Sequence, residues 1–171
     1  MRTAKVVVLP YTEEWKQAFE TIKAELLSAV GHLIEGIEHV GSTSVEGLSA
    51  KPCIDVDVII RDYTVFPAVV QGLQQIGYLH EGDLGIKERE AFAYSNKPQL
   101  YNHHLYVCPV HSAELHRHLT FRDHLRSHPA DAALYGAVKE EGARLYPNDI
   151  DRYIAHKEPC IRALYQKCGL E

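Results

Sequence analysis

The chain has 171 residues, 46% of them hydrophobic and 24% charged, and this length and composition predict one globular domain. Its formal net charge of −5 argues against bulk electrostatic attraction to nucleic acid or to an anionic membrane, so we expect neither as a partner. No apolar run reaches transmembrane length, and the cysteines show neither a CxxC pair nor zinc-finger spacing, so we expect a cytoplasmic protein with reduced thiols.

Strand patterns dominate the chain up to residue 110. Apolar side chains from Trp15 to Leu27 recur at helical spacing, whereas most later apolar runs have the length and alternation of strands. In chain order we predict a short strand or extended arm at 5–9, a helix from Thr12 to Gly31, strands at 37–40 and 53–60, a helix at 64–76, and strands at 78–82, 90–95 and 102–110.

From His111 onward the pattern becomes helical. Pro129 and Pro147 separate three predicted helices, which lie near 112–127, 130–145 and 149–168. Strands in the middle followed by helices at the end predict an α+β fold rather than a regular βαβ repeat. We therefore expect an αβ core over 1–110 and a C-terminal helical region over 111–171, packed on the core as a single compact unit.

Two aspartates, Asp55 and Asp57, interrupt the apolar run at 53–60. Side chains two residues apart on a strand point to the same face, here roughly 6–7 Å apart along it. Like charges this close repel each other, and an apolar setting would raise the pKa values of both carboxyl groups. One interpretation is a pair of solvated aspartates on an exposed face. The other is a site for Mg²⁺ or Mn²⁺, since Mg²⁺ favours two carboxylates together with substrate phosphates.

A Gly-Ser turn precedes this acidic pair in the sequence. Gly41 and Ser42 follow directly on the strand predicted at 37–40. Backbone N–H groups of such a turn, together with the hydroxyls of Ser42, Thr43 and Ser44, can hold a phosphate oxygen. The alternative is an ordinary turn without a ligand.

The complete pattern is a strand, Gly-Ser, twelve residues, and Asp-Val-Asp inside a second apolar strand. This order resembles the signature of the nucleotidyltransferase superfamily, whose fold is shared by aminoglycoside nucleotidyltransferases and DNA polymerase β. The resemblance implies a mixed β-sheet flanked by helices, in which the turn at Gly41 and Ser42 binds triphosphate. It also implies that Asp55 and Asp57 hold Mg²⁺ for attack on the α-phosphate.

The longer string HVGSTSVEGLSAKPCIDVDV, residues 39–58, resembles the GrpB family of small nucleotidyltransferase-like proteins. A domain of this type is also found fused to dephospho-coenzyme A kinase in some bacteria, which hints at nucleotide-like ligands. Segments that agree with the GrpB family lie along nearly the whole chain: Pro10-Tyr11, Trp15, Phe19, NHHLYV at 102–107, LTFRDHLRSHP at 119–129, Lys139 and Lys157.

One part of the superfamily pattern is missing. Active nucleotidyltransferases usually carry a third acidic residue on a neighbouring strand, but the strand predicted at 102–110 contains none. His104 or His103 could take this place, either as a neutral metal ligand or as a general base with a pKa near 6.5. Glu81 or Asp83 could instead supply the carboxylate from another strand end. Paired histidines in a strand are also typical of one buried, hydrogen-bonded ring beside one exposed ring.

A triphosphate site needs cationic side chains, because Mg²⁺ alone does not neutralise the ligand. Each cation taken singly is more typical of a solvated or ion-paired surface residue, and we expect the histidines between 111 and 128 to lie on the surface of a helix. The candidates are Lys51, Arg89, Arg117, Arg122, Lys139 and Lys157. From these we predict that Lys51, Arg122, Lys139 and Lys157 bind phosphate.

Two functions from different classes account for these patterns. The first is an enzyme that transfers a nucleotidyl group from a nucleoside triphosphate to an unknown small acceptor, with Asp55, Asp57 and His104 as its catalytic residues. The second is a non-catalytic domain that senses a nucleotide or coenzyme-like ligand. The intact Gly-Ser and Asp-x-Asp motifs favour the enzyme, whereas the missing third acid favours the sensor. We predict the enzyme; the acceptor, the base preference and the oligomeric state stay open.

Overall fold

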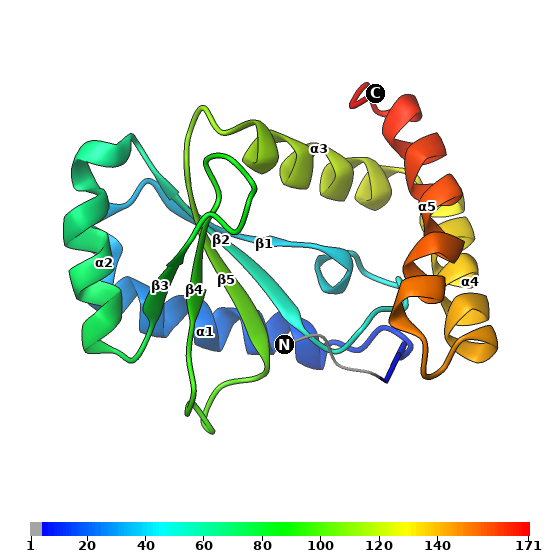
Figure 1. The fold of residues 1–171 in the computed structure, drawn as a ribbon, viewed down its shortest axis with the longest axis horizontal. Coiled ribbons are helices and arrows are strands. Elements are labelled where there is room, and N and C mark those ends of the chain that lie inside the picture. The colour runs from blue at the N-terminus through cyan, green and yellow to red at the C-terminus, as the bar shows by residue number, and fades with distance from the viewer. Residues whose placement is uncertain (1–4) are drawn as a thin grey trace.

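The computed structural model describes residues 5–171, so residues 1–4 of the predicted core lie outside it. Its single sheet has five strands: β1 (Gly36–Val40), β2 (Ile54–Ile60), β3 (Leu79–Gly82), β4 (Glu90–Ala93) and β5 (His103–Pro109). They follow the order β1-β2-β5-β4-β3 (Figure 1). β2 and β5 pair in parallel, and the other neighbours are antiparallel, so the sheet is mixed.

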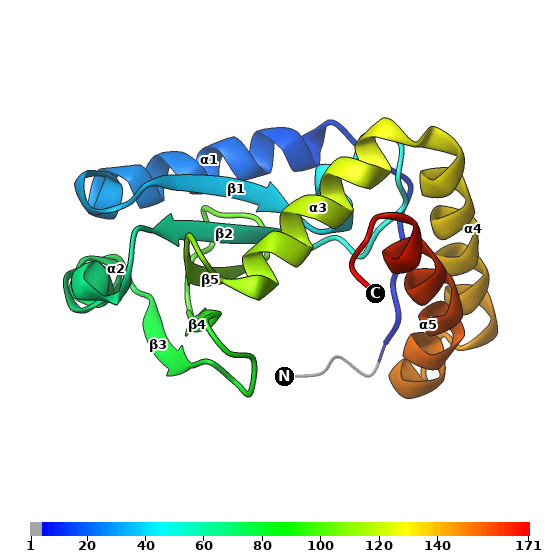
Figure 2. The same ribbon diagram turned by 90° about the horizontal axis from the view of Figure 1, so that it is seen from above.

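Helices flank this sheet on both sides (Figures 1 and 2). α1 (Glu14–Val30) and α2 (Phe66–Gln75) cover one face. α3 (Ala113–Ser127) crosses on the other side, and α4 (Pro129–Leu145) and α5 (Ile150–Lys167) lie side by side beyond one end of the strands. Three short 3₁₀ turns complete the elements: η1 (Gly31–Leu33), η2 (Ser42–Ser44) and η3 (Tyr63–Val65).

The main core lies between the sheet and the helices α1 and α2. The apolar stripe of α1, from Trp15 to Val30, packs on the inner face of β2. Because strand side chains alternate, Asp55 and Asp57 lie on the opposite face of β2. The β2 residues that point into the core are all completely buried: Ile54, Val56, Val58 and Ile60.

A second hydrophobic cluster joins the C-terminal helices to the loop that follows η2. Val45 and Leu48 of this loop are buried against side chains of α3, α4 and α5. The members of this cluster are Val45, Leu48, Leu125, Ala132, Tyr135 and Leu164. The helices therefore pack on the segment between β1 and β2, and the η2 turn lies between the sheet and the helical region.

The structure confirms the predicted α+β class with its mixed sheet, and the helices and strands predicted after Thr12 all form. The strand alternative for 5–9 is wrong: apart from an isolated bridge between Leu9 and Ala50, this segment is an extended arm. The helix predicted at 64–76 begins later, at Phe66, because η3 precedes it. Within residues 5–171 no helix has both the length and the apolar character needed to cross a bilayer.

Candidate functional site

The parallel pairing of β2 with β5 assembles the centre of the candidate site. It sets Asp55 beside His104 and Asp57 beside Tyr106, on the face of the sheet that α1 and α2 leave open. On the other side of β2, the end of β1 carries the Gly41-Ser42 turn to the same place, because Val40 pairs with Asp55. The structure thus brings the turn, the acidic pair and His104 together.

Gly41 makes the close approach of the turn to Asp55 possible. Its φ of 74° and ψ of −177° belong to a region that side-chain-bearing residues essentially never adopt. A Cβ atom at this position would also overlap the Asp55 carboxylate. Only glycine therefore allows this backbone to lie against the acidic pair.

His104 is the direct partner of Asp55. Its Nδ1 donates to Asp55 Oδ1 over 3.0 Å, and its side chain is 52% exposed. The hydrogen bond with Asp55, helped by a weaker one with Cys53, raises the pKa of His104 to about 10. This raised pKa differs from the value near 6.5 expected from the sequence and favours a protonated His104 that offsets the charge of Asp55; its role as a metal ligand or general base stays a prediction.

Asp57 forms a second pair, with a residue that the sequence analysis assigned to the surface. His118 of α3 donates from Nδ1 to Asp57 Oδ2 over 2.6 Å, and its Nε2 lies 3.2 Å from Glu114 Oε1. Burial opposes protonation of His118, but its bonds to Asp57 and the charge of Glu114 outweigh this and raise its pKa. The spacing Glu114-x-x-x-His118 on one helix face was the available sequence signal, and it was missed.

One oxygen of Asp57 is left without a partner. The Asp57 side chain has no exposed surface, and its Oδ1 has no hydrogen-bond partner among the described residues. Burial raises the pKa of Asp57, and the hydrogen bond from His118 counteracts this only in part. Such an atom is rare in folded proteins and usually has a ligand, an ion or a water as its partner.

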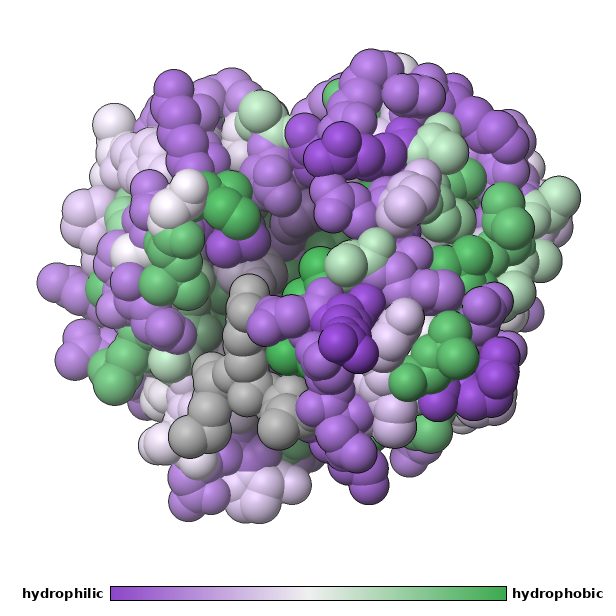
Figure 3. Space-filling model, turned by 45° about the vertical axis from the view of Figure 1, so that its right-hand side comes forward, coloured by the Kyte–Doolittle hydropathy of each residue, from purple (hydrophilic) through white to green (hydrophobic). Residues whose placement is uncertain are grey.

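A pocket of about 280 Å³ on one side of Asp55 is rich in lysine. We call it the lysine lobe. Lys139 and Lys157 enter it from α4 and α5, and Lys51 from the loop before β2, as predicted for a phosphate site. Burial and the neighbouring charge of Lys157 lower the pKa of Lys139 to about 7, and burial also lowers the pKa of Lys157. Figure 3 shows the hollow between the sheet side and the helical side of the molecule.

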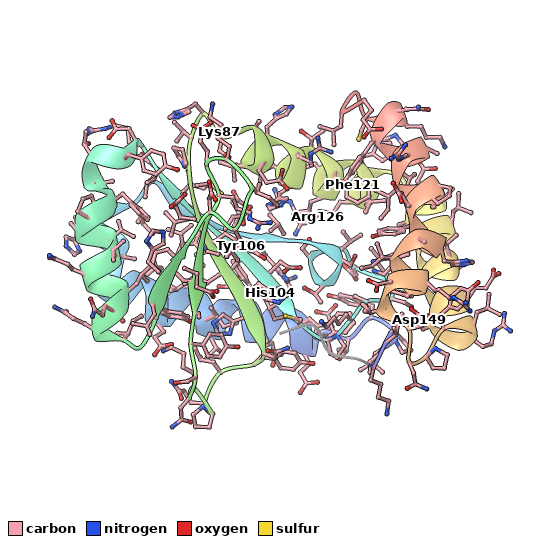
Figure 4. All side chains as sticks on the ribbon, in the orientation of Figure 1. Lys87, His104, Tyr106, Phe121, Arg126 and Asp149 are labelled. Atoms are coloured by element: carbon pink, nitrogen blue, oxygen red, sulfur yellow. The ribbon has the colours of Figure 1, made fainter. Side chains whose placement is uncertain are left out.

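A second pocket, of about 260 Å³, lies toward α3, and we call it the aromatic lobe. Phe121 contacts Tyr135 and Tyr165 with ring centroids 5.8 and 5.0 Å apart, and Arg117 lies over the ring of Tyr165. Figure 4 shows Phe121 below α3, on the side that faces the sheet. Both lobes are lined by Ser42, Asp55 and Tyr135, so they meet at the turn and the first aspartate.

Three predicted phosphate-binding side chains are engaged elsewhere. The Ser44 hydroxyl donates to the Gly41 carbonyl, and the Thr43 hydroxyl is hydrogen-bonded to His39. Arg122 lines the aromatic lobe rather than the lysine lobe, and its guanidinium is bound to Glu38, at 2.6 Å, as well as to Asp123. These three side chains thus have protein partners, and their role in phosphate binding stays a prediction; Ser42 lines both lobes, and its side chain is hydrogen-bonded with Tyr135.

The alternatives considered for the third acid lie on different elements, and Glu81 lines a cavity together with His104 and Tyr106. Glu81 lies on β3, which β4 and β5 separate from β2, and Asp83 accepts a hydrogen bond from the Gly85 backbone within its own loop. His103 points into the core side, where Nε2 meets Tyr78 at 2.6 Å, so the pair on β5 has one buried and one exposed ring. Among residues 5–171 no three His, Cys, Asp or Glu side chains converge as a ready-made metal site.

Comparison with known proteins identifies the family. The sequence profile described as GrpB protein matches residues 5–167. The chain belongs to the GrpB family. The crystal structure of GrpB from Enterococcus faecalis superimposes with a TM-score of 0.81 and 31% identity, over 95% of this chain and 96% of that one.

Curated relatives of this GrpB chain extend beyond it. The UPF0157 protein YqkA of Bacillus subtilis is 32% identical over 158 residues, which are 92% of this chain and 46% of YqkA. A UPF0157 protein of Pseudomonas aeruginosa is 35% identical over 92% of this chain and 65% of its own length. A dephospho-CoA kinase of Mycolicibacterium paratuberculosis is 27% identical over 96% of this chain and 46% of the kinase. The chain thus spans about half to two thirds of these relatives.

The fold of GrpB is that of the nucleotidyltransferases. The Cid1 poly(U) polymerase bound to MgATP superimposes with a TM-score of 0.56 over 79% of this chain and 44% of Cid1. The sequence identity is only 9%, so this likeness establishes the shared fold and nothing finer.

The residues present fit the divalent cation that this fold implies. Asp55 and Asp57 share one face of β2, and the buried Asp57 Oδ1 lacks the partner that a cation would supply. Two carboxylates completed by ligand phosphates are a typical arrangement for Mg²⁺. Without a cation, protonated His104 and His118 would offset the charges of the pair.

Proposed function

We propose that this GrpB chain binds a nucleoside triphosphate with Mg²⁺ or Mn²⁺ and transfers its nucleotidyl group to the hydroxyl of a small acceptor. One observation carries the proposal: Ser42 of the turn and Asp55 of the acidic pair line the pocket into which Lys139 and Lys157 project. Carboxylates for a cation and cations for phosphate thus border a single pocket. A purely structural protein has no use for this arrangement.

The lysine lobe is suited to the β- and γ-phosphates. Backbone N–H groups of the turn and the Ser42 hydroxyl supply hydrogen bonds, and the ammonium groups of Lys51, Lys139 and Lys157 supply charge. Lys139 is only 3% exposed, so its charge acts at short range in a setting of low dielectric. A cation held by the carboxylates would neutralise charge that develops on the α-phosphate during displacement.

His104 is the side chain best placed to handle the acceptor proton. With Nδ1 held by Asp55, Nε2 is the nitrogen that can take a proton from a hydroxyl. In the unliganded site this nitrogen already carries a proton, because the hydrogen bond to Asp55 raises the pKa of His104. With a cation on Asp55, the hydrogen bond to His104 would weaken and the pKa of His104 would fall, so that Nε2 could accept a proton.

The metal and nucleotide site is tested by an isosteric change. We expect Asp55→Asn to weaken Mg²⁺-dependent ATP binding at least tenfold in calorimetric titration, because it removes one charged ligand while leaving a hydrogen-bond acceptor for His104. Asp57→Asn should have the same effect, provided that thermal unfolding shows an intact fold. Glu35→Gln, which removes an exposed carboxylate outside the lobes, is the matched control. Unchanged ATP affinity in Asp55→Asn would rule out the site.

A second candidate function is nucleotide or coenzyme sensing without turnover. The observation in its favour is that β5 carries His104 where active nucleotidyltransferases usually have a third acid. Incubation with ATP, Mg²⁺ and pooled metabolites separates the two functions. Release of pyrophosphate that disappears in Asp55→Asn supports transfer, whereas tight binding without pyrophosphate release supports the sensor.

A further inference from the structure

A third cavity borders the Gly-Ser turn but belongs to neither lobe. Its volume is about 480 Å³, within the usual range for small-ligand sites. It shares Thr43 with the lysine lobe and no residue with the aromatic lobe. We call it the Arg126 cavity; it is lined by Tyr11, Lys16, His39, Thr43, Ser44, Glu46 and Arg126.

The charges around the Arg126 cavity favour an anion. Lys16 enters from α1 and Arg126 from α3, and among the described residues 5–171 no carboxylate lies within ion-pair distance of either. Glu46 is the one acidic side chain in the lining, so the cavity has an excess of positive charge in a chain whose net charge is −5. An unpaired guanidinium next to an ammonium is a typical recognition site for phosphate oxygens.

The floor of the Arg126 cavity is built from buried polar side chains. His39 is 8% exposed, is stacked on Phe19 with ring centroids 4.6 Å apart, and is hydrogen-bonded through Nε2 to the Thr43 hydroxyl at 2.9 Å. Burial, together with the charges of Arg126 and Arg122, lowers the pKa of His39 to about 4, so the ring is neutral. The floor is therefore polar and held in place by hydrogen bonds, and the exposed side chains of Lys16 and Arg126 lie at the rim of the cavity.

Hydrogen bonds connect the Arg126 cavity to the Gly-Ser turn. Arg126 Nε donates to the Ser44 carbonyl over 3.0 Å, and the Ser44 hydroxyl donates to the Gly41 carbonyl. Gly41 in turn lies against the Asp55 carboxylate. A ligand that draws on the remaining N–H groups of Arg126 would thus act on residues that hold the turn in place. Figure 4 shows Arg126 on the side of α3 that faces this region.

We propose that the Arg126 cavity is a second anion site, which takes the phosphate group of a small phosphorylated ligand and adjusts the Gly-Ser turn through Arg126. Lys16 and Arg126 supply two cations to the lining, partly offset by Glu46, so a phosphate dianion suits the cavity better than a singly charged carboxylate. The anion site stands independently of the proposed function, whereas its effect on nucleotide binding rests on it.

The test uses inorganic phosphate as the probe and amide chemical shifts of the ¹⁵N-labelled protein as the readout. Because phosphate also suits the lysine lobe, the titration is made in a Lys139→Met, Lys157→Met background. We expect saturable shifts at Thr43, Ser44 and Arg126 amides, and at least tenfold weaker binding after Arg126→Met. Lys16→Met should also weaken binding; it removes an exposed charge without touching the turn, so it answers the concern that Arg126→Met disturbs the fold.

Two results would overturn the inference. One is a phosphate affinity that neither Arg126→Met nor Lys16→Met changes; the other is the absence of shifts at the cavity in the lysine-lobe background. The coupling is measured separately, as the MgATP affinity with and without the phosphate probe in wild type and in Arg126→Met. Because phosphate can compete with MgATP at the lysine lobe in both proteins, the coupling is the additional effect of the probe on MgATP affinity in wild type relative to Arg126→Met. If MgATP does not bind at all, the proposed function is wrong, but the phosphate-induced chemical shifts still test whether the Arg126 cavity binds an anion.

Discussion

At the scale of single residues, the buried carboxylate of Asp57 determines what the site needs from a ligand. A carboxylate with no exposed surface and one unpartnered oxygen is unfavourable in a folded protein, where a missing hydrogen bond costs on the order of 1–3 kcal/mol. His118 offsets part of this cost through one oxygen, and a cation would offset the rest through the other. Asp55, at 30% exposure, is the more accessible member of the pair and the better first target for mutation.

Replacement of Gly41 should lower the stability of the protein directly. Gly41→Ala puts a Cβ into the Asp55 carboxylate and forces a backbone conformation that only glycine adopts easily, so we expect a loss of about 2–4 kcal/mol in the free energy of unfolding. Urea denaturation measures it. Gly47→Ala is the matched control: Gly47 also has a positive φ, 84°, but a Cβ there meets nothing within 4 Å. Equal losses at the two positions would show that the contact with Asp55 is irrelevant.

Lys139 should make nucleotide binding depend on pH near neutrality. Its pKa in the free protein is about 7, and a bound triphosphate favours the charged form, so binding takes up a proton once the pH exceeds 7. We expect the contribution of Lys139 to MgATP affinity to fall as pH rises from 7 to 9, with a limiting slope of about tenfold per pH unit. A proton released from His104 on cation binding would have the opposite effect, so the contribution of Lys139 is measured as the difference between wild type and Lys139→Arg. Calorimetry in buffers of different ionisation enthalpy measures the proton uptake.

The lowered pKa of Lys139 affects the stability of the free protein in the opposite direction, because stability rises with pH where MgATP affinity falls. Between the folded pKa of about 7 and the unfolded value of 10.5, the unfolded chain binds more protons at Lys139. This residue therefore contributes a rise in stability as pH increases through that window. Lys139→Arg, which keeps its charge throughout, should lose the fall in MgATP affinity that Lys139 causes, and the remaining pH dependence comes from Lys157 and His104. A pH profile identical to that of wild type would contradict the assignment.

At the scale of elements, local periodicity was sufficient to predict most of the helices and strands and to locate the acidic pair. β2 was recognisable because Ile54, Val56 and Val58 alternate with the aspartates, and the turn because Gly41 and Ser42 follow an apolar run. The Glu114-x-x-x-His118 spacing is visible in the sequence, but the pairing of His118 with Asp57 depends on α3 crossing the open face of the sheet, which no local pattern predicts. The expectation that the histidines of this region lie on the surface also fails at His124, whose side chain is 9% exposed and hydrogen-bonded to Asp131.

The contact between α4 and α5 gives a prediction at the same scale. A Cβ on Gly142 of α4 would lie 3.0 Å from ring atoms of Tyr153 and His156 on α5. Gly142→Ala gains about 1 kcal/mol in helix propensity but should overpack this contact by about 1–3 kcal/mol, so we expect a net loss of stability. Because α5 carries Lys157, MgATP affinity should also fall.

Gly136→Ala is the matched control for this prediction. It lies in the same helix, and its nearest neighbour, at 3.3 Å, is a methyl group at the end of the Leu48 side chain, which can move aside. We expect unchanged or slightly higher stability for Gly136→Ala in the same urea titration. A stability for Gly142→Ala equal to or above that of Gly136→Ala would show that the two helices are not tightly constrained at this contact.

At the scale of the whole molecule, the lobes lie where two hydrophobic clusters meet. One cluster holds the sheet to α1 and α2, and the other holds α3, α4 and α5 to the loop after η2. The residues of the lysine lobe come from both sides: Asp55 and His104 from the sheet, Lys139 and Lys157 from the helices. No pattern within one segment could predict this convergence, because it depends on how the helical region packs on the core. The resemblance to a family pointed to Lys139 and Lys157, which line the lysine lobe, whereas Arg122 lines the aromatic lobe and is ion-paired with Glu38.

A ligand that bridges the two sides should be visible as protection from hydrogen exchange. We expect saturating MgATP to slow exchange in η2, α4 and α5, and to leave α2 and the edge strand β3 unchanged, because the latter pair lies outside both lobes. At a ligand concentration of 100 times Kd, the stabilisation of the folded state should reach about 2.7 kcal/mol. Asp55→Asn provides the control, since it should abolish protection by MgATP at the same nucleotide concentration. Protection confined to α2 and β3, or protection that persists in Asp55→Asn, would place the nucleotide elsewhere on the molecule.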